Sequence, residues 1–253
     1  QTKDLTWTTM LNFGHNHNEL TKIYGEENQI ISGVRIHKVG EPYYSYYGYE
    51  YAGVDPNTGR ESYYLNDGTS NARNTTVNPN EAKKVIIGNH ETKIEGGFSN
   101  NITWKFIDFG LNFTFSLGGK AFDAATWQHN NGNYTFGGQL PTYYDINKMW
   151  TGPGDTNASQ PVFQYGNSSE VSSRWLMPTD YLRLKSLTLG FTAPSQWVTR
   201  IGLSKARAFF SASNLLTWKS KDLYVDPEMR VDGVCTFQTP ALRTFTFGIE
   251  LGF

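Results

Sequence analysis

The sequence contains little charge, one cysteine and no long apolar run. Charged residues make up 18% of the 253 residues and the formal net charge is -1, which excludes the basic surface that nucleic-acid binding needs. The single cysteine, Cys235, excludes an internal disulfide and a thiolate metal cluster. The absence of any apolar run of about 18 residues excludes a transmembrane helix. Gln1 begins a polar stretch without the regions of a signal peptide, so we expect either a protein that is not exported or a precursor whose first part is missing.

The residues that are abundant favour β-structure. Aromatic residues reach 15%, there are 25 glycines, and Asn and Thr are frequent while Ala and Leu are scarce. The mean hydropathy of -0.50 is typical of a soluble protein, but membrane β-barrels give similar values because half of each strand faces a wet lumen.

The clearest pattern is the alternation of the final residues, 244–253. Phe245, Phe247, Ile249, Leu251 and Phe253 fall on one side of a strand, and Thr, Gly and Glu fall on the other. A segment of about ten residues is the length that a tilted strand needs to cross a bilayer. A soluble sheet could show the same alternation, so the number of such segments decides its meaning.

Further segments repeat this pattern along the chain, at 5–13, 98–106, 107–118, 181–191 and 206–216. The segments 98–106 and 107–118 predict a tight hairpin around Phe106 to Asp108. A polar turn from Gly14 to Asn18 predicts a return strand that begins at 20–24. The sequence therefore predicts about seven antiparallel strands of bilayer-spanning length.

The predicted connections alternate between short turns and long loops. The short ones lie near Gly14, near Phe106 and after Pro194, and the long ones cover residues 25–95, 119–180 and 217–241. Short turns at one rim and long extracellular loops at the other are typical of a transmembrane antiparallel β-barrel. An odd strand count would place Gln1 outside the cell, whereas complete bacterial barrels have an even count. We therefore expect the closing strands of a larger barrel.

The remaining motifs offer few candidates for chemistry. His15 and His17 could bind a metal, but no third ligand is evident, and we expect a solvated turn. Asp55 to Gly59 predicts a turn that closes a loop hairpin. The tyrosines between Tyr43 and Tyr51 predict either contacts to a sugar or partner or the packed interior of a loop. No arrangement argues for catalysis, so we expect no enzyme, no cofactor and no metal.

Several motifs together resemble the carboxy-terminal end of the SusC/RagA-like TonB-dependent transporters of Bacteroidota. Residues 181–191, YLRLKSLTLGF, are similar to the strand YLRLKNLTLGY of that family and are followed by Pro194 and Trp197. The ending SASNLLTW at Trp218, the triplet Asp226-Pro-Glu228 and the final RTFTFGIELGF complete the resemblance. Residues 49–59 and 96–100 match weaker landmarks, whereas residues 91–95 depart from the Pro-Lys pair that the family often has.

The resemblance implies the function of the whole protein. It implies a 22-stranded barrel with a plug, of which residues 1–253 are the carboxy-terminal part without plug or earlier strands. It implies import of oligosaccharides or peptides across the bacterial outer membrane, energised by TonB, with a SusD-like surface lipoprotein as partner. Membrane lipid and lipopolysaccharide would surround the barrel. The alternatives are a passive porin or small complete barrel, and a soluble carbohydrate-binding β-module.

The candidate site residues fall into two sets. By resemblance to outer-membrane proteins, a barrel-assembly signal is expected at the carboxy-terminal strand, in Phe245, Phe247 and Phe253. Ligand or partner contacts are expected from aromatic residues of the extracellular loops, namely Tyr43, Tyr44, Tyr46, Tyr47, Trp127 and Trp150.

Overall fold

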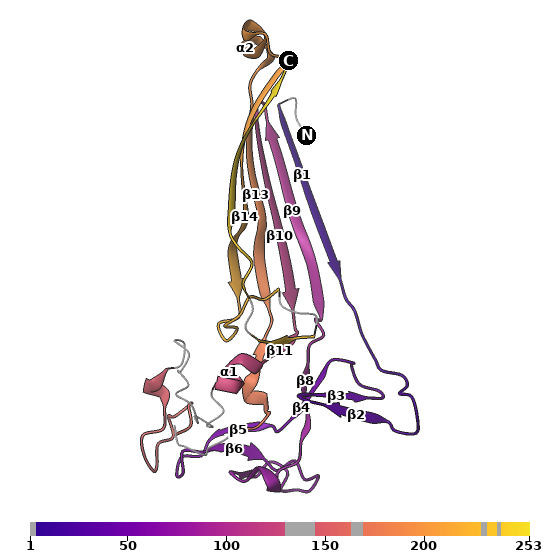
Figure 1. Cartoon of the computed structure of the whole chain (residues 1–253), viewed down its shortest axis with the longest axis vertical. Helices are drawn as coiled ribbons and strands as arrows, with labels where there is room; N and C mark the ends of the chain where they lie inside the picture. Colours follow the sequence, from indigo (N-terminus) through magenta and orange to yellow (C-terminus); the bar gives the residue numbers. More distant parts are fainter. Residues whose placement is uncertain (1–3, 130–144, 163–168, 229–231, 237–238) are drawn as a thin grey trace.

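A computed structural model describes residues 4–129, 145–162, 169–228, 232–236 and 239–253. The molecule is elongated, with a tall sheet of long strands at one end and a body of short elements at the other (Figure 1). No helix in the described part of the chain is long and apolar enough to span a membrane.

Six long strands form one antiparallel sheet. In spatial order they are β1 (Leu5–Gly14), β9 (Ile94–Trp104), β10 (Ile107–Leu117), β13 (Tyr181–Thr192), β14 (Lys205–Lys219) and β16 (Thr244–Gly252). Strands that follow one another among these six are neighbours in the sheet, so it is a meander in which each strand reverses the direction of the last.

The register places the predicted apolar residues on a common face of all six strands. One row across the sheet contains Trp7, Ile102, Phe109, Leu189, Phe210 and Phe247. Residues paired across strands lie on the same side of a sheet, so the rows above and below this one continue the apolar surface. We call this surface the apolar face.

A polar side chain interrupts the apolar face without being left unsatisfied. The Asn100 side-chain oxygen accepts hydrogen bonds from Trp7 Nε1 at 2.9 Å and from Thr9 Oγ1 at 2.7 Å. These two bonds join β9 to β1 and supply partners that hydrocarbon could not.

The opposite, polar face carries hydroxyl, amide and charged side chains. Arg207 on β14 reaches Asp108 on β10 at 2.6 Å, across the intervening Gly190 of β13. A Cβ at Gly190 would lie 2.4 Å from the Asp108 carboxylate and 2.5 Å from the Arg207 guanidinium. Glycine at this position therefore leaves the space through which the ion pair forms.

The predicted hairpin at Phe106 is confirmed, but the predicted turn at Gly14 is wrong. Trp104 pairs with Ile107 across the two residues Lys105 and Phe106. Residues 20–24 form no strand, and β1 pairs with β9 instead. The sheet has six strands rather than about seven because the partner of β1 lies far along the chain.

The corrected count also reverses the predicted placement of the amino-terminal end. Leu5 and Gly252 lie at the same end of the sheet as the Lys105–Phe106 turn (Figure 1). The predicted division into short and long connections is confirmed. Residues 105–106 and 193–204 connect strands at that end, and residues 15–93, 118–180 and 220–243 connect them at the other.

The long connections form a folded body of short elements, which we call the loop body. Its sheets are β2 (Gln29–Ser32), β3 (Arg35–Lys38), β4 (Ser45–Gly48) with β8 (Val85–Asn89); β5 (Tyr51–Val54), β6 (Glu61–Tyr64) with β7 (Thr75–Thr76); and β12 (Leu176–Pro178), β11 (Lys120–Asp123) with β15 (Val234–Cys235). The helices are α1 (Ala124–His129) with the 3-10 turns Pro79–Glu81, Ile146–Lys148 and Ser173–Trp175 in the loop body, and α2 (Ser195–Val198) with Thr199–Ile201 at the short-turn end. β15 pairs with β11 in parallel, which joins two different long connections.

Candidate functional site at the loop end of the sheet

All three long connections meet in the hydrophobic core of the loop body. One cluster joins Tyr46, Phe122, Ala124 and Trp175, and a second joins Ala121, Met177, Leu223 and Cys235. Such contacts between segments distant in the sequence make the loop body an ordered part of the fold rather than a set of independent loops.

The predicted tyrosine contacts divide by burial. Tyr46 is fully buried, and its hydroxyl donates to the carbonyl oxygens of Gly233 at 2.9 Å and Lys120 at 3.1 Å. Burial raises the pKa of Tyr46 well above its usual range. This residue therefore holds two long connections together, which is the packed-interior role that the sequence left open.

Tyr43 is the exposed member of the tyrosine group. Its ring is 43% exposed and stacks on His37 with the ring centroids 4.4 Å apart. Tyr44 packs edge-on against Tyr43 at 5.0 Å, and the Arg35 guanidinium lies 4.9 Å from the Tyr44 ring. Tyr47 is half-buried. A ligand that approaches this surface would therefore meet Tyr43 first.

The two predicted tryptophans lie in different places. Trp127 on α1 packs against the Tyr46 cluster and donates from Nε1 to Ser169 O at 2.9 Å. Trp150 lies over the turn from Asp55 to Gly59, where its Nε1 donates to Pro56 O at 2.9 Å. A Cβ at Gly59 would lie 2.5 Å from the Trp150 ring, so glycine permits this contact.

The turn predicted at Asp55 to Gly59 is confirmed. It joins β5 to β6, and the Asp55 carboxylate accepts from the backbone nitrogens of Asn57 at 3.1 Å and Thr58 at 2.7 Å. The hydrogen bond from the Thr58 hydroxyl is the largest cause that holds the pKa of Asp55 below its usual range.

A cavity of about 560 Å³ lies in the loop body and is lined by side chains of both charges. Its lining includes Lys120, Asp123, Lys148 and Arg174. Arg174 is ion-paired with the buried Glu61 and donates to Gln160 Oε1 at 2.6 Å. Sequence reasoning missed these residues because they come from separate segments and share no local spacing. The volume falls in the range of small-molecule sites.

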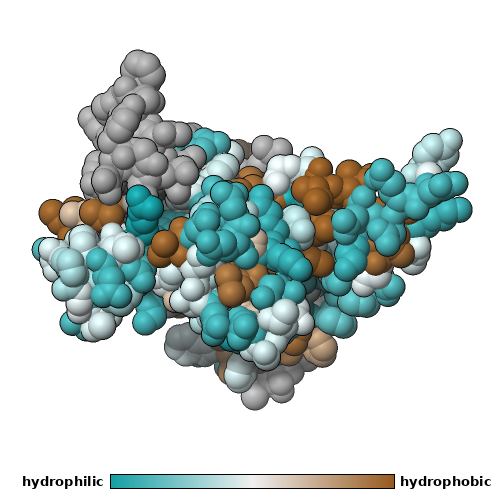
Figure 2. Space-filling model, turned by 90° about the horizontal axis from the view of Figure 1, so that it is seen from below, coloured by the Kyte–Doolittle hydropathy of each residue, from teal (hydrophilic) through white to brown (hydrophobic). Residues whose placement is uncertain are grey.

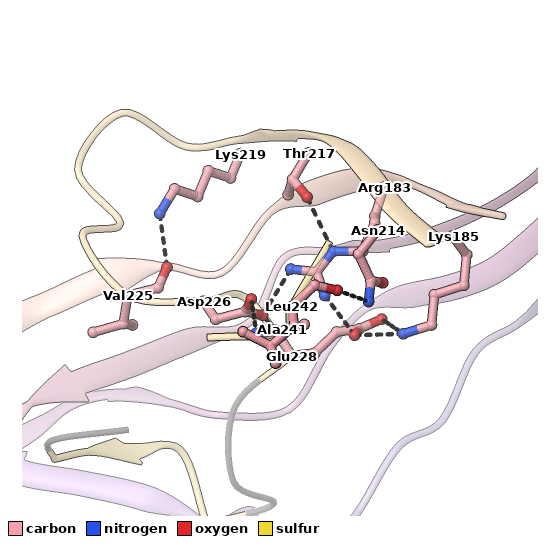
Figure 3. Close-up of polar contacts among 10 residues, drawn as sticks. All are labelled: Arg183, Lys185, Asn214, Thr217, Lys219, Val225, Asp226, Glu228, Ala241 and Leu242. Carbon is pink, nitrogen blue, oxygen red and sulfur yellow. Dashed lines mark hydrogen bonds and ion pairs between the residues drawn. The ribbon is translucent and has the colours of Figure 1, made fainter. Parts of the chain in front are cut away.

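A cluster of ion pairs fastens the β14–β16 connection to the polar face (Figure 3). Arg183 of β13 is 2% exposed and donates to Asp226 Oδ1 at 2.7 Å and Glu228 Oε2 at 2.6 Å. Lys185 donates to the same Glu228 oxygen at 2.6 Å. Removing one partner of a buried ion pair costs about 3–5 kcal/mol, because the other charge is left unpaired.

The remaining predicted residues have simple placements. Phe245, Phe247 and Phe253 are 56%, 80% and 93% exposed, and the first two pack on Phe210 with centroids 6.2 Å and 4.9 Å away. His15 and His17 line an open hollow with Glu91 and Lys93. Within the described ranges, no three His, Cys, Asp or Glu residues are grouped to hold a metal. Cys235 is buried, and burial raises the pKa of its thiol to about 12.

Comparison with known proteins relates the chain to outer-membrane receptors. It is 28% identical over 290 residues to TonB-dependent receptor P3 of Formosa agariphila, across 99% of this chain and 27% of that protein. It is 24% identical over 271 residues to TonB-dependent receptor SusC of Bacteroides thetaiotaomicron, across 100% of this chain and 25% of SusC. The chain thus spans about a quarter of the length of these relatives. No protein-family model matches it.

Solved structures give the same answer. The RagAB peptide transporter superposes with a TM-score of 0.84 at 26% identity, across 100% of this chain and 28% of that one. The RagAB peptide importer in its 'open-open' state gives 0.79 at 26% identity, across 100% and 27%. Together with the apolar face, these likenesses define a wall segment of an outer-membrane β-barrel. The chain is part of a SusC/RagA-like TonB-dependent transporter of the bacterial outer membrane.

Proposed function

We propose that the whole protein imports oligosaccharides or peptides across the outer membrane with energy passed through TonB. The observation that carries this proposal is the joint match of wall and loop body to a structure named as a peptide importer, across 100% of this chain. The apolar face would contact membrane lipid, and lipopolysaccharide would surround the outer rim. The polar face would line the lumen.

The chain would supply the carboxy-terminal part of the barrel. Its relatives are about four times longer, which leaves room for a plug and further strands, by resemblance 22 in all. A SusD-like lipoprotein would cover the loop body. Figure 2 shows that the loop end is mostly hydrophilic with smaller hydrophobic patches, a mixture suited to a partner that leaves and returns.

Specific residues would serve assembly and recognition. Phe245, Phe247 and Phe253 would form the signal read during barrel insertion, and their exposure leaves them accessible. Tyr43, with Tyr44, Tyr47, Trp127 and Trp150 behind it or nearby, would contribute loop contacts to ligand or partner. We assign no covalent chemistry to the protein.

Uptake by cells that carry the full-length transporter tests this function. We expect accumulation of oligosaccharides or peptides that stops when TonB is deleted, because the plug opens only under applied force. Cells that lack the transporter are the control. Uptake that continues without TonB would identify a passive porin, and recovery of folded protein without detergent would favour a soluble module.

A further inference from the structure

The segment from Leu223 to Glu228, which we call the strap, connects the core of the loop body to the strand wall. At one end Leu223 is 1% exposed and packs with Ala121, Met177 and Cys235. At the other end Asp226 and Glu228 are ion-paired with Arg183 and Lys185 of β13. A few residues of chain therefore link a hydrophobic core to a set of charges.

Two irregularities in the strands create the wall side of this contact. The register between β13 and its neighbours shifts around Lys185, and β14 answers with Asn214, whose φ is +54°. A bulge places successive residues on one side of a strand. Lys185 thereby joins Arg183 on the polar face, and Asn214 Nδ2 donates to Leu242 O at 3.0 Å.

The strap itself is preformed for this contact. Asp226 Oδ1 accepts from Glu228 N at 2.9 Å, and Oδ2 accepts from Ala241 N at 3.1 Å. Pro227 fixes one backbone angle between the two carboxylates. Lys219 Nζ donates to Val225 O at 2.8 Å. Both arms of the β14–β16 connection are thus held to the sheet (Figure 3).

We propose that the strap fixes the loop body over the mouth of the lumen, with Arg183 as the positioning residue. Arg183 pairs with Thr114 and Thr217, which lie on the polar face, so the strap lies inside the barrel wall rather than above it. Its release would free Leu223 from the loop-body core. The proposal depends on the outer-membrane placement and not on which solute is carried.

Cys235 provides a reporter within the same core. It is 0% exposed and packs with Leu223, so a thiol reagent reaches it only when this core opens. Labelling then follows the population of the opened form. Mass spectrometry of the peptide that contains Cys235 separates this signal from any other cysteine of the full-length protein.

The experiment compares Arg183→Gln with the unaltered full-length transporter in whole cells treated with a membrane-impermeant maleimide. We expect Cys235 labelling to rise by about tenfold or more, while heat-modifiability of the barrel is kept. Glu228→Gln tests the strap without changing a strand, and we expect a smaller rise. Arg183→Lys restores a cation without the guanidinium fork and should lower labelling below that of Arg183→Gln.

Arg207→Gln is the matched control, because it removes an arginine ion pair from the same polar face at the other end of the sheet. We expect unchanged Cys235 labelling in this variant. Unchanged labelling in both Arg183→Gln and Glu228→Gln would overturn the proposal. An equal rise in Arg207→Gln would also overturn it, because the cause would then be general loss of stability.

Discussion

Asp226 is the residue in which several structural demands converge. Its carboxylate accepts hydrogen bonds from Arg183, from Glu228 N and from Ala241 N. Burial alone would raise its pKa, but the Arg183 hydrogen bond and the two backbone donors outweigh burial and lower the pKa below the usual 3.8. The ionised form is therefore the one that the fold stabilises.

This lowered pKa predicts how the strap responds to acid. A carboxyl group with a depressed folded pKa stabilises the fold above its unfolded pKa, and that contribution is lost as the pH falls through the folded value. We expect the strap amides of residues 223–228 to stay protected from hydrogen exchange at neutral pH and to lose protection below pH 3.8.

Exchange rates corrected for the intrinsic pH effect measure this change. Arg183, Lys185 and Glu228 face the same contact, so Asp226→Asn isolates the contribution of Asp226. Protection that depends on pH equally in Asp226→Asn and in the unaltered protein would contradict the assignment.

At the scale of elements, the strands are encoded locally with high fidelity. Tyr181–Thr192 and Thr244–Gly252 begin at the residues that alternation predicts. The spacing of Leu182, Leu184, Leu187 and Leu189 breaks the alternation once, at the position of the bulge. That break was the available sequence signal for the second cation, Lys185, on the polar face.

A charge on β10 tests which face meets lipid. Leu111 lies on the apolar face between Asn100 and Leu187, and Leu111→Arg should destabilise the barrel by about 2–4 kcal/mol if it sits near the bilayer midplane. Urea unfolding in lipid vesicles measures the difference. Asn112→Arg, one residue further on the polar face, should cost less, and equal costs would contradict the assignment of faces.

At the scale of the whole molecule, the sheet and the loop body depend on each other. The sheet brings the ends of β1, β9, β10, β13, β14 and β16 together, and the three long connections complete one another's cores. The apolar face is continuous only across all six strands. Neither the barrel wall nor the loop body is therefore a property of one segment.

The carboxy-terminal residue offers a test at this scale. Deleting Phe253 from the full-length protein should lower the amount of assembled barrel, because an exposed aromatic at the end of β16 is proposed to form part of the insertion signal. Heat-modifiable protein in outer-membrane fractions is the measurement. Trp197→Ala, an exposed aromatic at the same end of the sheet, is the control. Normal assembly without Phe253 would refute the assignment.

The sequence alone determined the strand type, the apolar face and the division of connections, because alternation of side chains is a local property of an extended chain. It failed at residues 20–24, where the nearest apolar segment was taken as the partner of β1. Only the tertiary structure decided that β1 pairs with β9, and hence that the strands number six. It also decided that Tyr46 is core and that Arg183 meets Asp226, since contacts between distant segments depend on how the chain packs and leave no local pattern.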